Sequence, residues 1–330
     1  MKPTQLKQAL IHLTDKKRPA FIWGPPGVGK SDIVREVAEH RKVELRDVRL
    51  SLMDPTDLKG LPVISGAGAK KQVSWAAPDF LPTKGKGILF LDELVSAPQS
   101  VQAASYQLIL NRKIGDYELP EGWSVLAAGN RAGDRAVVHA MPSALANRFV
   151  HIDFDVDPDD WSIWAVQNGV SDLTRGFIRF RPDLLHKFDA ATNPRAFPTP
   201  RSWVFCDDVI QSGLSADTEL ELIRGTVGEG AAIEYVAHIR MAKDLPSVDE
   251  ILMNPDSAPV PTSPASKYAI CTALDKKANK GTIGRLLSYV GRLDAEYQVV
   301  FMRAAGAINR EILQTKEGVK WLTDNQEILI

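Results

Sequence analysis

This chain of 330 residues contains only two cysteines, Cys206 and Cys271. So few cysteines exclude a disulfide scaffold and favour a reducing compartment. Neither cysteine has metal-ligand spacing around it, so both are predicted to be core thiols. Long apolar runs are also missing: none approaches the ~20 residues of a membrane span, and the N-terminus lacks the apolar core of a signal peptide. The cytoplasm is therefore the expected location.

An excess of charge of one sign is missing as well. The chain has 40 Lys and Arg residues against 41 Asp and Glu residues, a formal net charge of −1. No overall basic field therefore favours nucleic acid, although a local basic channel is still compatible with this balance. The composition, 44% hydrophobic and 25% charged, is ordinary for a globular protein, and the length allows two domains.

The most informative segment present is 24–31, which fits the phosphate-binding pattern G-x-x-x-x-G-K-[ST]. An apolar strand at 20–23 precedes it and a helix pattern at 31–40 follows it, which is the context that this loop requires. Lys30 is predicted to reach the β- and γ-phosphates, and the Ser31 hydroxyl to bind Mg²⁺. The predicted phosphate-binding residues are Gly24, Pro25, Pro26, Gly27, Val28, Gly29, Lys30 and Ser31.

A second motif is the apolar run 88–91, which ends in Asp92 and Glu93. Ligands bind at the C-terminal ends of parallel strands, so both acids are predicted to face the phosphate loop. Asp92 is predicted to hold Mg²⁺ directly or through water, opposite Ser31. Glu93 is predicted to polarise a water for attack on the γ-phosphate. Two solvated acids at a strand end are the plainer alternative.

Three further polar residues follow at element ends. Asn130 ends the buried strand 125–130 and is predicted to orient the attacking water or contact the γ-phosphate; a turn asparagine is the alternative. Arg148 follows a short helix and is predicted to stabilise charge on the transferred phosphoryl group, unless it forms a surface ion pair. Arg201, which opens a helix, is predicted to reach the nucleotide from a second domain, with Arg195 as its competitor and local pairing as the alternative.

The spacing of elements predicts two regions. Residues 1–157 alternate strands and helices, which indicates an α/β core whose parallel sheet is covered on both faces. Two segments, about 54–82 and 113–122, interrupt this alternation, and the second is predicted to be a hairpin. Residues 158–330 are predicted to be all-α, with a mobile or surface segment at 245–266 and a long helix at 294–313. For residues 243–330 two interpretations stay open: an enlarged lid, or a surface on which a partner docks.

The order of these motifs resembles the AAA+ ATPases over about residues 15–215. Segments 54–60, 92–102 and 145–149 resemble the MoxR branch, which includes RavA- and CbbQ-like proteins. The resemblance implies a P-loop NTPase core with a helical lid and C-terminal extension, ATP with Mg²⁺ as ligands, and a ring that is usually a hexamer. It also implies that Asn130 is sensor 1, Arg201 is sensor 2 and Arg148 is an arginine finger acting in trans.

In this family the two interruptions correspond to the helix-2 and pre-sensor-1 insertions, which line the pore of the ring. The insertion residues to test are Lys70, Lys71, Trp75 and Tyr117, with ordinary loop surface as the alternative. The family also implies a partner that carries a von Willebrand factor A domain. One departure is that Leu94–Ala97 follow the two acids, where the MoxR pattern has Ile-Asn-Arg-Ala.

Three functions are compatible with these features. An ATP-driven machine that remodels a protein target is the leading hypothesis. A nucleic-acid motor or McrB-like restriction NTPase is the second; segment 66–71 would contact phosphates, but the net charge and the lack of an added DNA-binding domain argue against it. A switch that binds ATP and barely hydrolyses it is the third, and Glu93 argues against it.

Overall fold

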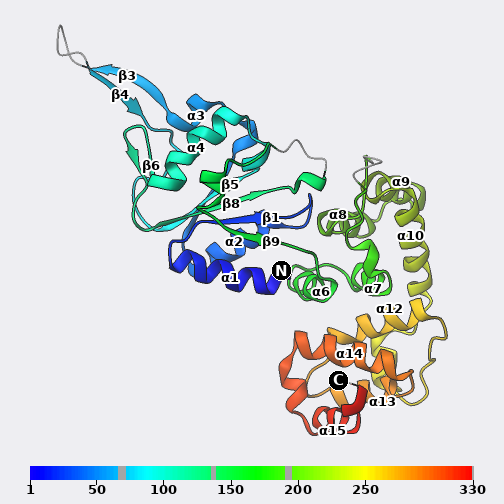
Figure 1. The fold of residues 1–330 in the computed structure, drawn as a ribbon. Helices are drawn as coiled ribbons and strands as arrows, with labels where there is room; N and C mark the ends of the chain where they lie inside the picture. The colour runs from blue at the N-terminus through cyan, green and yellow to red at the C-terminus, as the bar shows by residue number, and fades with distance from the viewer. Residues whose placement is uncertain (66–71, 135–138, 190–194, 329–330) are drawn as a thin grey trace. The chain divides into compact units, whose positions relative to one another are not determined.

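The computed structural model describes residues 1–65, 72–134, 139–189 and 195–328. Its main sheet has five parallel strands (Figure 1). Their spatial order is β2 (Glu44–Arg49), β5 (Gly87–Asp92), β8 (Trp123–Gly129), β1 (Ala20–Trp23) and β9 (Val150–Asp153). Every residue of β5 and β8 is buried, which explains why their sequences are almost wholly apolar.

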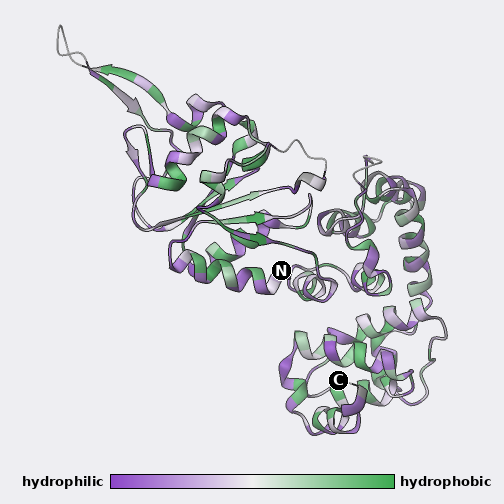
Figure 2. Ribbon diagram, in the orientation of Figure 1, coloured by the Kyte–Doolittle hydropathy of each residue, from purple (hydrophilic) through white to green (hydrophobic). Residues whose placement is uncertain are grey.

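Helices cover both faces of this sheet. α1 (Pro3–Asp15) and α2 (Lys30–Arg41) bury Leu10 and Val34 in a cluster with Ile22 of β1. α4 (Gln99–Asn111) buries Leu108 in a second cluster with Phe21. Successive strand residues point to opposite faces, so Phe21 and Ile22 each supply one core. Figure 2 shows hydrophobic and hydrophilic residues mixed along α1 and α2, as expected for helices with one buried face. The α/β core predicted from the sequence is confirmed.

The two interrupting segments form antiparallel hairpins. The first has α3 (Pro55–Lys59), β3 (Leu61–Ser65) and β4 (Gln72–Ala76), and the second has β6 (Lys113–Ile114) and β7 (Tyr117–Glu118). The hairpins touch, because the backbone N–H of Trp75 donates to Asp116 Oδ2 at 2.8 Å. The Tyr117 hydroxyl is bonded to the Pro82 carbonyl at 2.6 Å. Lys70 and Lys71 lie outside the described residues.

The main boundary between two compact units lies between Val156 and Asp157. The second unit is helical over its described residues, which confirms the prediction of a helical C-terminal part. Across the described ranges, no helix is long and apolar enough to span a membrane. The helices of the second unit are α6 (Pro158–Gln167), α7 (Asp172–Phe180), α8 (Pro200–Ile210), α9 (Ala216–Val227), α10 (Glu229–Lys243), α11 (Val248–Met253), α12 (Pro264–Asp275), α13 (Ile283–Val290), α14 (Ala295–Ile308) and α15 (Lys316–Asp324).

The structure differs in detail from two expectations for the second unit. The segment 245–266, expected to be a mobile or surface segment, is exposed or half-exposed at most positions, but it contains α11 and buries Ile251 and Ala258 in the core around α12 and α13. Its proline-rich composition hid the few apolar residues that anchor it. The long helix expected at 294–313 ends at Ile308, because the Asn309 side chain accepts a hydrogen bond from Glu311 N and begins a separate 3-10 turn.

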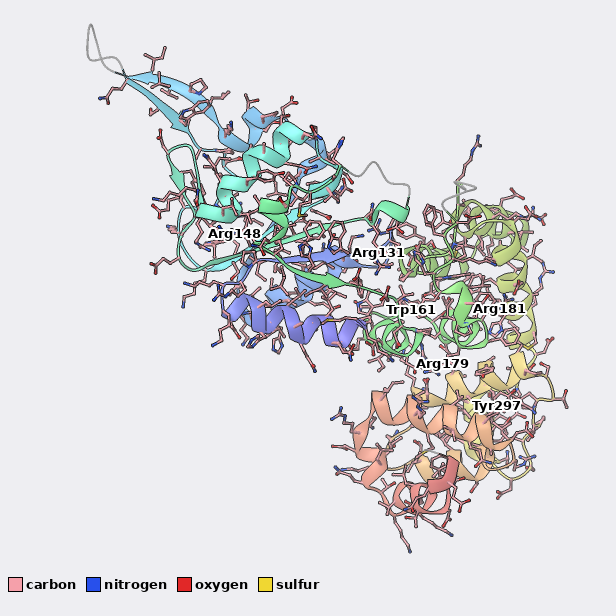
Figure 3. All side chains as sticks on the ribbon, in the orientation of Figure 1. Arg131, Arg148, Trp161, Arg179, Arg181 and Tyr297 are labelled. Carbon is pink, nitrogen blue, oxygen red and sulfur yellow. The ribbon has the colours of Figure 1, made fainter. Side chains whose placement is uncertain are left out.

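A buried ion cluster joins α7 to α12. Arg175 Nη1 lies 3.2 Å from both carboxylate oxygens of Asp275, and neither side chain is exposed to solvent. Arg179, labelled in Figure 3, donates to the same carboxylate. Buried charges are tolerated only where they are paired, so this cluster fixes the relative position of the two helices. The two cysteines are buried and unpaired, as predicted for core thiols.

His238 of α10 gives the second unit a built-in sensitivity to acid. Its ring is 4% exposed, neither ring nitrogen has a hydrogen-bond partner among the described residues, and burial lowers its pKa to about 4. Phe177 and Phe180 of α7 lie beside the ring, at centroid distances of 5.6 and 6.2 Å. The folded state therefore holds the neutral imidazole, whereas the unfolded chain takes up a proton near its ordinary pKa of about 6.5.

We expect this difference to lower the free energy of unfolding as the pH falls from about 6.5 towards 4. Between about pH 7 and pH 5 the loss attributable to His238 should be about 2 kcal/mol. Urea unfolding of the second unit at both pH values measures it. The His238→Leu variant should lose about that much less stability on acidification, whereas a Met253→Leu control at an exposed position of the same unit should behave as the wild type. Equal acid losses in all three proteins would contradict the assignment.

Candidate functional site

The loop 24–31 connects β1 to α2 at the C-terminal edge of the sheet. Gly27 and Gly29 have φ angles of 77° and 93°, in the left-handed region that favours glycine. A Cβ on Gly24 would lie 3.1 Å from the carbonyl oxygen of Phe154, so a side chain there would crowd the residue that follows β9. The loop thus has a backbone that only these glycines permit, followed directly by the N-terminus of a helix, an arrangement suited to a phosphate group.

Lys30 connects the loop to the end of β8. Its Nζ donates to the carbonyl oxygens of Gly24 at 2.7 Å and Pro25 at 3.0 Å. It also donates to Asn130 Oδ1 at 2.9 Å. Two residues separated by 100 positions in the sequence, and predicted independently, therefore meet at one point of the sheet edge. An ammonium group placed beside the loop is suited to pair with phosphate oxygens.

Ser31 and Asp92 form the second pair. Ser31 Oγ donates to Asp92 Oδ2 at 3.0 Å, and Asp92 is 7% exposed. Magnesium prefers oxygen ligands and is commonly held by one or two protein oxygens plus water and substrate phosphates. This hydroxyl–carboxylate pair fits that donor set. No larger cluster of His, Cys, Asp and Glu suited to a metal occurs among the described residues.

Glu93 follows directly, with a φ of 57° that is unusual for a residue with a side chain. Its backbone N–H donates to Asp92 Oδ1 at 2.9 Å. Its carboxylate accepts a hydrogen bond from the Ser51 hydroxyl. The sequence motifs did not predict this contact. It arises because β2 pairs with β5 and Ser51 comes two residues after the end of β2. Such strained backbone concentrates at functional sites.

Asp47 of β2 is a further acid on the strand that pairs with β5. Burial is the main cause that raises its pKa, and the charge of Asp92 adds to the effect.

Arg131 was also missed. It follows Asn130 at the end of β8 and bridges to the end of β9, with Nη2 2.9 Å from Asp155 Oδ1 and 3.2 Å from the Phe154 carbonyl (Figure 3). The hydrogen bond from Arg131 lowers the pKa of Asp155. A cavity of about 390 Å³ lies beside it, lined by Trp23, Arg131, His139, Met141, His151 and Asp153 among others. These contacts tie the end of β8 to that of β9.

The predicted arginines are placed differently from the other site residues. Arg148 follows α5 (Ser143–Ala146) and is exposed, and its side chain makes no hydrogen bond or ion pair with the described residues (Figure 3). Arg201 is the second residue of α8 in the second unit; it and Arg195 are both exposed. The roles of all three arginines at a nucleotide stay predictions.

A five-stranded parallel sheet with this loop at its C-terminal edge is the P-loop NTPase fold. Residues 19–149, most of the first unit, match the family model of the AAA domain (dynein-related subfamily). This match agrees with the AAA+ resemblance seen in the motifs of the chain.

Among curated proteins, midasin of Giardia intestinalis is 27% identical over 181 residues, which cover 52% of this chain. The chain spans only 4% of the length of that relative. Among solved structures, a RuvB mutant of Thermotoga maritima matches with a TM-score of 0.41 at 15% identity, covering 77% of this chain and 75% of that one. A putative ATPase of Cytophaga hutchinsonii matches with a TM-score of 0.37 at 13% identity, covering 90% of this chain and 79% of that one.

Proposed function

We propose that this chain hydrolyses ATP with Mg²⁺ as a MoxR-type AAA+ protein, working as a ring, usually a hexamer, in the cytoplasm. The observation that carries the proposal is the meeting of Lys30 with Asn130 and of Ser31 with Asp92 at one sheet edge, next to Glu93. A loop for phosphates, oxygen ligands for a metal and a carboxylate beside them are the parts that phosphoryl transfer to water requires.

The residues divide the work as follows. The amides of the loop and Lys30 bind the β- and γ-phosphates. Mg²⁺, held by Ser31 and Asp92, would neutralise developing charge on the phosphate oxygens. Glu93 accepts a proton from the attacking water while the water oxygen bonds to the γ-phosphorus. The bond from the γ-phosphorus to the β–γ bridging oxygen breaks, which releases ADP and phosphate. Asn130 orients the water or the γ-phosphate.

Arg148 acts in trans in this proposal. Its side chain is exposed and has no hydrogen-bond or ion-pair partner among the described residues, as expected of a side chain that completes the site of a neighbouring subunit. Arg201 acts as sensor 2 from the helical lid, so that the angle between core and lid depends on the bound nucleotide. Arg195 remains the competing residue for that role.

The work that hydrolysis drives is remodelling or activation of a protein target, with a partner that carries a von Willebrand factor A domain. The hairpin of β3 and β4 supports the remodelling role, because it presents the exposed apolar residues Leu61, Ile64 and Val73 to solvent. Exposed apolar patches of this kind mark protein-contacting surfaces. Trp75 and Tyr117 are the described residues of the hairpins to test first.

Lys30→Ala should weaken nucleotide binding about 10- to 100-fold, because it removes a charge-assisted contact with phosphate worth about 1.5–3 kcal/mol. Titration with a fluorescent ATP analogue measures the affinity. Lys16→Ala, at an exposed position of the same unit, is the control and should bind as the wild type does. Unchanged affinity in Lys30→Ala would remove the phosphate-binding assignment of the loop.

A further inference from the structure

The backbone that carries Arg148 is held by two hydrogen bonds to a single carbonyl. The Ala146 carbonyl, at the end of α5, accepts from Phe149 N at 3.2 Å and lies 2.9 Å from His151 Nε2. In sequence, Arg148 lies between Ala146 and Phe149, inside the turn that the first of these hydrogen bonds closes, and its own side chain makes no bond to the described residues. The direction in which Arg148 leaves the surface is therefore set by this turn.

The second ring nitrogen of His151 links the turn to the phosphate loop. Trp23 Nε1 lies 2.9 Å from His151 Nδ1, and an indole nitrogen can only donate. Nδ1 must accept, so the imidazole is neutral and carries its proton on Nε2, which donates to the Ala146 carbonyl. Trp23 is the last residue of β1, directly before Gly24. One side chain thus connects the start of the phosphate loop to the turn of Arg148.

Aromatic packing supports the same connection. The rings of Trp23 and His151 lie nearly parallel, with an interplanar angle of 19° and a centroid distance of 6.0 Å. Phe149, next to Arg148, packs edge-on against Phe21 of β1 at 5.5 Å. β1 and β9 pair with Phe21 opposite His151. Phe149 and His151, which follow Arg148 in the chain, are therefore both in contact with β1.

We propose that His151, held by Trp23, is a positioning residue for Arg148 and aims it at the nucleotide site of the neighbouring subunit. The inference rests on the proposed function, in which Arg148 acts in trans. Loss of the His151 hydrogen bonds should therefore lower ATP hydrolysis at the site of the neighbouring subunit. This is expected even though Trp23, which holds His151, adjoins the phosphate loop of its own subunit. A role confined to its own loop predicts the opposite.

The test compares ATPase activity and nucleotide affinity in full-length rings. His151→Phe keeps the aromatic ring and removes both hydrogen bonds, and Trp23→Phe removes only the indole donor. Each should lower kcat about 10- to 100-fold, as small misplacements of a catalytic group do, with nucleotide affinity unchanged. Val150→Ala, at an exposed position of β9, is the control and should match the wild type.

Mixing experiments then locate the defect. Glu93→Gln subunits, which carry an intact Arg148, should restore hydrolysis at His151→Phe sites, whereas Glu93→Gln/Arg148→Ala subunits should not. Weakened nucleotide affinity in His151→Phe would overturn the inference, as would wild-type kcat or a failure of rescue under conditions where Arg148→Ala is rescued. Wild-type turnover by Arg148→Ala rings would instead refute the trans role in the proposed function, and this inference with it.

Discussion

Arg148→Ala rings should bind ATP with wild-type affinity and lose about 10³- to 10⁵-fold in kcat, the range of an arginine that stabilises a transferring phosphoryl group. The physical reason is that charge develops on the γ-phosphate oxygens only in the transition state, so the arginine contributes to turnover and not to ground-state binding. Steady-state ATPase assays and nucleotide titration on the same preparation separate the two quantities. Arg18→Ala, an exposed arginine of the same unit, is the matched control.

The trans role of Arg148 has its own test. Lys30→Ala subunits bind nucleotide poorly but present an intact Arg148 to their neighbours. Mixing them with Arg148→Ala subunits should therefore create some sites that have both a working loop and a working arginine, and activity should exceed that of either variant alone. Activity at the level of the unmixed variants would argue for a role of Arg148 within its own subunit, and wild-type activity in Arg148→Ala rings would remove its catalytic role.

Glu93→Gln should retain ATP and lower kcat about 10²- to 10⁴-fold, the contribution of a positioned general base. The amide keeps the shape of the side chain and can still accept a hydrogen bond from Ser51, but it cannot take a proton from water. Single-turnover hydrolysis measures the loss. Glu39→Gln, at an exposed position of α2, should hydrolyse normally. Normal turnover in Glu93→Gln would assign the base to another residue.

The same variant provides a route to the partner. Trapped with ATP in cells of the source organism, Glu93→Gln should hold its target long enough for purification, and mass spectrometry then identifies the proteins that accompany it. A protein with a von Willebrand factor A domain would support the MoxR-type function. Nucleic acid that nuclease removes, with no protein partner, would favour the motor or restriction function.

Short motifs predicted the phosphate loop and the two acids because their chemistry lies in consecutive residues. The glycines of 24–29 permit a backbone that other residues resist, and an apolar strand followed by Asp92 and Glu93 places both acids at the sheet edge through strand geometry alone. The neighbourhood of Asn130 and Lys30 also followed from the edge rule, since parallel strands end together. The hydrogen bond between them required the coordinates.

By itself, the sequence determined that this protein has a parallel α/β core with a phosphate loop, because local spacing dictates strands, glycine turns and helix starts. Only the tertiary structure decided which distant residues are joined around that loop. Ser51 donates a hydrogen bond to Glu93, Arg131 to Asp155 after the end of β9, and Trp23 to His151. The same holds for Asp275, whose charge is buried because α7 brings two arginines to it. These contacts depend on strand order, register and helix packing. Those features bring together residues that lie far apart in the sequence and at spacings that no helix or strand periodicity predicts.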